Sequence, residues 1–313
     1  MLQIVLIVLP VFLLIAAGYL AVLLRYLPVA IADALSGFAI KLAVPCLLFT
    51  AMIRINFASA FSWQILISFY VGAVVCFVSA ILIARTVFKR RPGEAASVGF
   101  AATFSNSLLL GVPIVERAHG DDALMFAFGV IAVHAPILYT IGMVTMEIMR
   151  RDGKTFTQTA QDAARSIIAN PLIVGITFGL LVNVSGINVP EPVNVPIQML
   201  ASAAIPAALV GMGAALTRYQ VTADLPEIGV VSAFSLVIHP AIAFLLSHVI
   251  FDLPEPTVLA IVTVAAMPPG VNIYVFAALY DRAVGLAASA LLIATALAMV
   301  TVSSWLYILQ LSF

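Results

Sequence analysis

Two short polar interruptions hold most of the groups in this chain that could do chemistry, because the segments around them are almost wholly apolar. The first reads Ser-Asn-Ser-Leu-Leu-Leu-Gly-Val-Pro over 105–113, and the second reads Pro-Pro-Gly-Val-Asn-Ile-Tyr over 268–274. Proline removes a backbone donor, and glycine and serine ease a kink, so each segment predicts a break within a helix. A half-helix that begins at such a break presents free N–H groups and partial positive charge, which suit an anion or carboxylate.

We predict that the two breaks cross and line one binding cavity, where Asn106 and Asn272 add amide donors and acceptors. The alternative is that proline and glycine only kink membrane helices, while serine and asparagine hold helices together. The matched positions of the two breaks favour the binding site. The predicted substrate-binding residues are Ser105, Asn106, Ser107, Gly111, Pro113, Pro268, Pro269, Gly270, Asn272 and Tyr274.

The composition predicts a polytopic membrane protein. Hydrophobic residues make up 64% of the chain and charged residues 9%, against about 45–50% and about 25% in soluble domains. The formal net charge of zero offers no basic face for nucleic acid. A membrane-spanning helix needs about 20 mostly apolar residues. Runs of this kind predict an all-α protein with ten transmembrane helices, at 3–24, 33–53, 64–87, 94–117, 122–149, 166–184, 195–216, 227–250, 255–280 and 283–309.

The two halves of the chain resemble each other at a separation of 161 residues. The matching pairs are Pro10 with Pro171, Gly18 with Gly179, Pro45 with Pro206, and Glu94 with Glu255. Five helices per half is an odd number, so the second repeat must be inverted in the membrane. The predicted organisation is a first repeat over 1–149, a cytoplasmic linker over 150–165 and a second repeat over 166–313. Paired interrupted segments in two such halves are typical of a transporter's binding site.

The distribution of basic residues predicts the orientation. Eleven lysines and arginines fall in the loops and helix ends of one side, and two, Arg54 and Arg117, fall on the other. Cytoplasmic loops carry the excess of basic residues, so both termini are expected outside the cytoplasm.

Three ionisable residues within spans are candidates for coupling or gating: Lys41, His134 and His239. Lys41 has no acidic residue three or four positions away, and an intramembrane lysine is a functional hypothesis; the alternative is that its stem reaches the interface. Each histidine is either a hydrogen-bonded structural residue or a proton carrier.

The sequence does not support an enzymatic function. No aspartate lies deep in a span, and the serine-hydrolase, zinc-hydrolase and phosphate-loop motifs do not occur. Cys46 and Cys76 lack paired spacing, so neither a disulfide nor a metal site is expected. We predict that the chain is no enzyme and that it needs no cofactor or metal.

Four motifs together resemble the auxin efflux carrier family, within the superfamily of the bile-acid:sodium symporters, over nearly the whole chain. They lie at 40–49, 104–114, 170–175 and 267–275. The resemblance implies a scaffold (1–53 plus 166–216), a mobile transport domain (64–149 plus 227–309) and a substrate site where the fourth and ninth helices cross. It also implies a homodimer formed through the scaffold. Family members often carry lysine before the proline of the eighth helix, where this chain has His239.

We therefore predict a secondary or facilitative transporter of a small organic anion in a cell membrane, most simply a bacterial inner membrane. The substrate would be a carboxylate such as malonate, or an auxin-like aromatic acid, moved by alternating access. An anion channel or a membrane receptor of the same fold is the alternative. The sequence selects neither the substrate, the direction of transport nor the coupling ion.

The orientation can be tested by cysteine labelling. A membrane-impermeant thiol reagent should label a cysteine placed at Ser312 in intact cells, but not one placed at Thr157 in the linker. The reverse pattern would contradict the inverted repeat, because that repeat depends on an odd number of spans in each half.

Overall fold

The computed structural model describes residues 2–55, 60–150, 171–219 and 225–313. All the regular secondary structure in these residues is helical, apart from one isolated β-bridge. The α-helices are α1 (Leu2–Leu23), α2 (Ile31–Phe38), α3 (Val44–Met52), α5 (Trp63–Thr86), α6 (Pro92–Ala101), α7 (Val112–Arg150), α9 (Pro171–Ser185), α10 (Glu191–Leu216), α11 (Leu225–Ala233), α12 (His239–Phe244), α13 (Glu255–Ala265), α14 (Asn272–Tyr280) and α15 (Val284–Ser312). The π-helical turns are η1 (Ala39–Ala43), η2 (Ser107–Gly111), η3 (Phe234–Ile238) and η4 (Leu245–Ile250).

Seven helices in the described residues are long and apolar enough to span a membrane, which fits a multi-pass membrane protein. They are Gln3–Leu23, Ile31–Met52, Trp63–Thr86, Ser107–Arg150, Glu191–Leu216, Leu225–Ile250 and Val284–Ser312. The predicted spans 94–117 and 255–280 are missing from this set because each is cut in its middle, as the prolines and glycines predicted. The cuts separate α6 from η2 and α13 from α14.

The break predicted between 94–117 and 122–149 falls at Gly120, whose φ of 75° and ψ of −171° are not helical and where α7 is kinked. One predicted helix start needs correction: α6 begins at Pro92, so that Glu94 is its third residue, whereas α13 begins at Glu255 as predicted. These two helix starts lie 163 residues apart, although Glu94 and Glu255 match at 161. The predicted linker lies outside the described residues, apart from Arg150.

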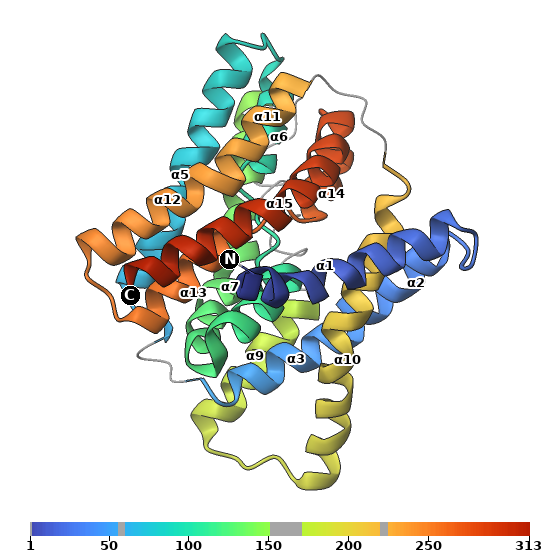
Figure 1. The fold of residues 1–313 in the computed structure, drawn as a ribbon, viewed down its shortest axis with the longest axis vertical. Helices are drawn as coiled ribbons and strands as arrows, with labels where there is room; N and C mark the ends of the chain where they lie inside the picture. Colours follow the sequence, from blue (N-terminus) through green and yellow to red (C-terminus); the bar gives the residue numbers. More distant parts are fainter. Residues whose placement is uncertain (1, 56–59, 151–170, 220–224) are drawn as a thin grey trace. The chain divides into compact units, whose positions relative to one another are not determined.

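The chain divides into two compact units. Unit 1 comprises 1–8, 61–163 and 219–313, and unit 2 comprises 9–60 and 164–218, so that α1 contributes to both. In unit 1, α5 packs against α6 and α12, and α7 packs against α6 and α13 (Figure 1). The last helix, α15, packs against α11 and α14.

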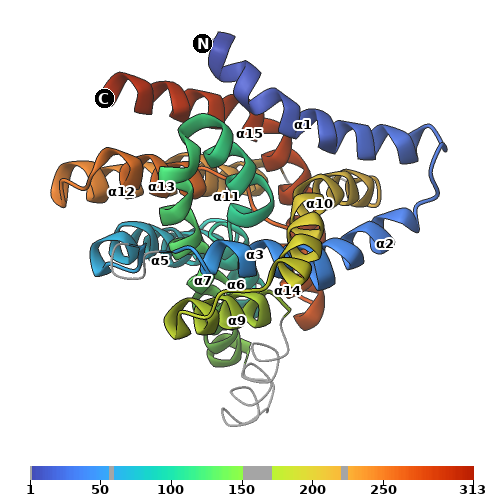
Figure 2. The ribbon, with the colours of Figure 1, turned by 90° about the horizontal axis from the view of Figure 1, so that it is seen from below.

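Unit 2 is built on very close helix contacts. Helix α10 packs against α2 and α3, and α3 packs against α9 (Figure 2). A Cβ atom at Gly18 in α1 would lie 2.1 Å from the carbonyl oxygen of Val210 in α10. A Cβ atom at Gly179 in α9 would lie 2.8 Å from the carbonyl oxygen of Phe49 in α3. Small residues let membrane helices approach at backbone distance, where van der Waals packing is strongest.

Polar side chains complete the ends of helices in unit 2. The amide nitrogen of Asn183 donates to the carbonyl oxygens of Met52, Ile53 and Ile55, at 3.1, 2.9 and 3.0 Å. These carbonyls lie at the C-terminus of α3, where no further helical N–H follows to pair with them. A single side chain therefore both caps α3 and attaches it to α9.

Unit 1 contains an ion pair whose carboxylate is buried. Glu227 at the start of α11 is 1% exposed, and the Arg90 guanidinium donates to its two carboxylate oxygens, with the shortest N–O distance at 2.7 Å. The two-pronged geometry provides both charge compensation and directed hydrogen bonds for the buried carboxylate. The pair attaches the α5–α6 connection to α11.

Gly18→Ala should lower the thermal stability of the purified protein, because the new methyl group has no space against Val210 and overpacking typically costs about 1–3 kcal/mol. Gly37→Ala is the matched control in the same unit. A Cβ atom there would meet nothing within 4 Å, and alanine in a helix interior is favoured over glycine by roughly 0.5–1 kcal/mol. Equal melting temperatures for the two variants would contradict the close packing of α1 on α10.

Candidate functional site

The two helix breaks meet and bond to each other within unit 1. The backbone N–H of Asn106 donates to the carbonyl oxygen of Pro268 at 2.8 Å, and that of Gly270 donates to the carbonyl oxygen of Phe104 at 3.0 Å. Ser105 and Pro269 are thereby paired in a short antiparallel bridge. The pairing is reciprocal, since each break supplies one donor and one acceptor to the other.

Hydroxyl groups satisfy further backbone carbonyls around the breaks. The Thr103 hydroxyl donates to Gly99 O at 2.9 Å, and the Ser235 hydroxyl donates to Met267 O at 3.2 Å. The hydroxyl oxygens of Ser105 and Ser107 lie 2.6 Å apart, one donating to the other. Because an unpaired backbone group in hydrocarbon costs several kcal/mol, these serines and threonines are part of what allows the helices to be broken.

A half-helix begins at each break. The segment η2–α7 begins at Ser107, with Asn106 in the N-cap position, and α14 begins at Asn272. The first N–H groups of a helix have no carbonyl one turn earlier in the helix to accept their hydrogen bonds, and they form the positive end of the helix dipole. The bridge thus places two half-helix N-termini in one part of unit 1, which is an arrangement suited to a negatively charged ligand.

The predicted site residues differ in accessibility. Asn106 is 7% exposed, and Ser105 and Ser107 are buried more deeply. Asn272 and Tyr274 are half-buried. The side-chain oxygen of Asn272, Oδ1, accepts a hydrogen bond from the Tyr139 hydroxyl at 3.3 Å. The Tyr274 ring lies 4.8 Å from the Tyr219 ring. The α14 side of the bridge is therefore more exposed than the η2 side.

The remaining predicted residues shape the backbone around the bridge. Gly111 and Pro113 are buried where η2 passes into α7. A Cβ atom at Gly111 would lie 3.2 Å from a methyl carbon of Val264, so η2 and α13 pack closely. Pro268, Pro269 and Gly270 form the irregular segment between α13 and α14. All ten predicted substrate-binding residues thus lie in unit 1.

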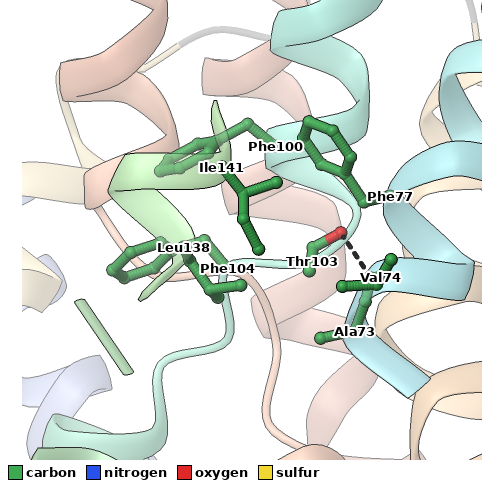
Figure 3. Close-up of a pocket in the computed structure, with 8 residues that line it drawn as sticks. All are labelled: Ala73, Val74, Phe77, Phe100, Thr103, Phe104, Leu138 and Ile141. Atoms are coloured by element: carbon green, nitrogen blue, oxygen red, sulfur yellow. Dashed lines mark hydrogen bonds between the residues drawn. The ribbon is translucent and has the colours of Figure 1, made fainter. Parts of the chain in front are cut away.

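The hollow beside the first break is lined by apolar groups. Figure 3 shows its lining, in which Thr103 is the only polar side chain among those drawn, with its hydroxyl 3.5 Å from the Ala73 carbonyl oxygen. The hollow has no room for a water molecule. The space beside the first break is thus narrow and apolar, and the rings of Phe100 and Phe104 form part of its lining.

A larger hollow of about 450 Å³ lies elsewhere in unit 1 and had no counterpart in the sequence analysis. It is lined by Gln3, Ile4, Ile7, Ala118, His119, Glu255, Leu259, Leu306, Leu309, Gln310 and Phe313. His119 Nε2 and the Thr263 hydroxyl oxygen share a hydrogen bond of 3.0 Å. The lining residues come from four separate helices and from Phe313, which follows α15, so no local sequence pattern could have grouped them.

The two candidate coupling histidines share an aromatic cluster next to the first break. The Phe69 ring lies 4.7 Å from the His239 ring and 5.5 Å from the His134 ring, and the Phe104 ring lies 4.8 Å from that of His134. His239 Nε2 lies 3.1 Å from the Phe69 carbonyl oxygen. Within the described part of the chain, neither ring nitrogen of His134 makes a hydrogen bond of good geometry, although the Ser105 backbone lies alongside. Lys41, by contrast, is exposed on η1 in unit 2.

Comparison with known proteins identifies the class of protein to which the chain belongs. Residues 3–306 match the family described as "Membrane transport protein". The chain is 27% identical over 305 residues, 97% of its length and 95% of the relative's, to a protein of Rhizobium meliloti named "Putative malonate transporter". It is 24% identical over 317 residues, 97% of its length and 98% of the relative's, to an uncharacterized transporter of Methanocaldococcus jannaschii. A third similarity, 28% over 185 residues, covers 53% of the chain and 21% of the lysosomal cholesterol signaling protein of Mus musculus.

The chain therefore belongs to this family of membrane transport proteins, the auxin efflux carrier family, as its four motifs predicted. It is a multi-pass membrane protein of a transporter family, and its family implies a small-molecule substrate.

The histidine pair generates a prediction about pH. Protonation of either imidazole would bury a charge among aromatic rings, which is unfavourable without a compensating partner. We therefore expect the pH profile of transport to be the same in wild type, His134→Gln and His239→Gln. A pH dependence in the histidine range that disappears in one of the two variants would instead identify that residue as a proton carrier.

Proposed function

We propose that this protein is a secondary or facilitative transporter of small organic anions and that it holds the anion where the two helix breaks meet. The observation that carries the proposal is the reciprocal bonding of Asn106 N–H to Pro268 O and of Gly270 N–H to Phe104 O. This bonding places the N-termini of η2 and α14 together. A carboxylate between them would face the positive ends of two helix dipoles.

The composition of the site favours an anion over a cation. None of the ten residues has an acidic side chain, and a cation would need carboxylate or carbonyl oxygens. The carbonyls of Phe104 and Pro268 are already occupied by the bridge. The relative named for malonate makes a small dicarboxylate the first substrate class to test; auxin-like aromatic acids are the second.

Ten spanning helices in two inverted repeats complete the proposal. Gly18 contacts Val210, and Gly179 contacts Phe49. The glycines of the two contacts, at 18 and 179, lie 161 residues apart, and so do their partners, at 49 and 210. A contact that recurs with its partners exchanged is what a twofold relation between repeats produces. The reciprocal bonds between the breaks support the same relation, and with it the crossing of the fourth and ninth helices.

Unit 2 would serve as the scaffold and unit 1 as the mobile transport domain. The close glycine contacts of unit 2 favour rigidity, and every site residue belongs to unit 1. Alternating access would then expose the site to each side in turn, as is usual when broken helices form a midplane site. A homodimer through the scaffold, a place in a bacterial inner membrane and external termini are parts of the same proposal.

An anion channel or a membrane receptor of this fold is the competing function. Uptake of mono- and dicarboxylates into proteoliposomes, under sodium and proton gradients imposed separately, distinguishes a transporter, a channel and a receptor. Saturable counterflow of an anion supports the transporter. Steady current without saturation supports the channel, and binding without flux supports the receptor.

Asn106→Ala or Asn272→Ala should raise the KM for the transported carboxylate about 10- to 100-fold, because a hydrogen bond to a charged group contributes about 1.5–3 kcal/mol. Asn194→Ala, which removes an amide from α10 in unit 2, is the matched control and should leave KM unchanged. Normal transport of every carboxylate by both site variants would show that the bridge is structural and that the anion binds elsewhere.

Pro269→Ala should affect turnover more than affinity. Alanine supplies an N–H where proline has none, so the backbone between α13 and α14 can move towards continuous helix and away from the bridge. The kcat of transport should fall while KM changes less, in the same uptake assay. A variant with wild-type kcat would show that the break does not depend on this proline.

A further inference from the structure

Tyr139 connects the two helix breaks, although it belongs to neither. It lies on α7, beyond the Gly120 kink, and its hydroxyl donates to the side-chain carbonyl oxygen of Asn272 at 3.3 Å. Its ring lies 5.4 Å from the ring of Phe104, the residue whose carbonyl accepts the bond from Gly270. One side chain therefore contacts the second break through its hydroxyl group and the first through its ring.

In the structure, the hydrogen bond from Tyr139 occupies the oxygen end of the Asn272 amide. A side-chain amide has an oxygen that accepts and a nitrogen that donates two hydrogens. With the oxygen occupied by the phenol, the nitrogen is the end left for a ligand, and the Asn272 side chain makes no other hydrogen bond among the described residues. If the amide turned over, its oxygen would face the ligand and would repel a carboxylate.

We propose that Tyr139 is a positioning residue that makes the site selective for anions, by holding the Asn272 amide with its two N–H donors towards the substrate. The inference rests on the proposed function, since it assumes that Asn272 contacts the transported anion. Both side chains are half-buried, so they lie where a ligand reaches the bridge, whereas Asn106 is 7% exposed.

The ring of Tyr139 is held independently of its hydroxyl group. It lies 5.3 Å from the Phe100 ring and 6.3 Å from the Phe276 ring, while those two rings stack on each other at 4.0 Å. Aromatic pairs at these separations are favourable in their own right. Tyr139→Phe should therefore keep the packing and remove only the orienting hydrogen bond.

The test is uptake of radiolabelled malonate into proteoliposomes, followed by the same assay with each mono- or dicarboxylate that the wild type moves. Tyr139→Phe should raise KM about 3- to 10-fold, as expected for one hydrogen bond between neutral groups, with kcat unchanged. Inhibition by malonamide, the neutral analogue, should weaken less than malonate affinity, so that selectivity for the anion falls. In an Asn272→Ala background, Tyr139→Phe should have no further effect.

Tyr70→Phe is the matched control. Tyr70 also donates its hydroxyl to an oxygen on α7, the Val130 carbonyl at 2.9 Å, but it does not contact Asn272. Removing the Tyr70 hydroxyl should therefore leave the KM for malonate and the selectivity for the anion at wild-type values.

The outcomes separate this inference from the proposed function. If Asn272→Ala raises KM but Tyr139→Phe does not, the positioning role is wrong and the anion site stands. The positioning role is also wrong if Tyr139→Phe raises KM equally with and without Asn272. If the wild type moves no carboxylate, or if neither asparagine variant changes KM, the proposed function fails and the inference fails with it.

Discussion

A lipid bilayer offers no water to an unpaired backbone amide, and the site depends on how this chain meets that constraint. Breaking two helices at membrane depth frees donors and acceptors that would each cost several kcal/mol in hydrocarbon. The bonds from Asn106 to Pro268 and from Gly270 to Phe104 pair them across the breaks. Each irregular segment is therefore stable only beside the other, so the two half-helix N-termini that could receive an anion are held together by the energetics of the breaks themselves.

The two units use contrasting interactions. In unit 2, Gly18 and Gly179 bring helices into backbone contact, and such packing leaves little freedom for adjustment. In unit 1, the breaks are surrounded by hydroxyl groups, aromatic rings and the Asn272 amide, which accepts a hydrogen bond from Tyr139. Hydrogen-bonding groups of this kind can exchange partners when a substrate arrives. A rigid unit and an adaptable one are the physical requirements for a scaffold and a transport domain.

The sequence was sufficient to predict the helices and the breaks, because both have local causes. Long apolar runs predict spans, and Pro268-Pro269-Gly270 interrupts a helix wherever it occurs. The family followed from motifs of the same kind. The matched positions of the two breaks also predicted that they meet. What the sequence could not predict are individual contacts between distant side chains and helices, such as the Tyr139–Asn272 bond and the capping of α3 by Asn183. Nor could it predict that the space beside the first break is narrow and partly lined by phenylalanine rings, since burial depends on the whole of unit 1. One helix start was displaced where capping, rather than hydrophobicity, sets the first residue: α6 begins at Pro92, after the N-cap residue Arg91, rather than at Glu94.

The central claim is that the anion binds between the two half-helix N-termini, and locating a bound dicarboxylate tests it most directly. Bromomalonate carries a heavy atom whose anomalous scattering identifies it in a crystal of the complex. The account predicts the bromine peak beside Asn272, with a carboxylate against the first turns of η2 and α14. A peak in the hollow lined by His119 and Glu255, with none at the bridge, would contradict it.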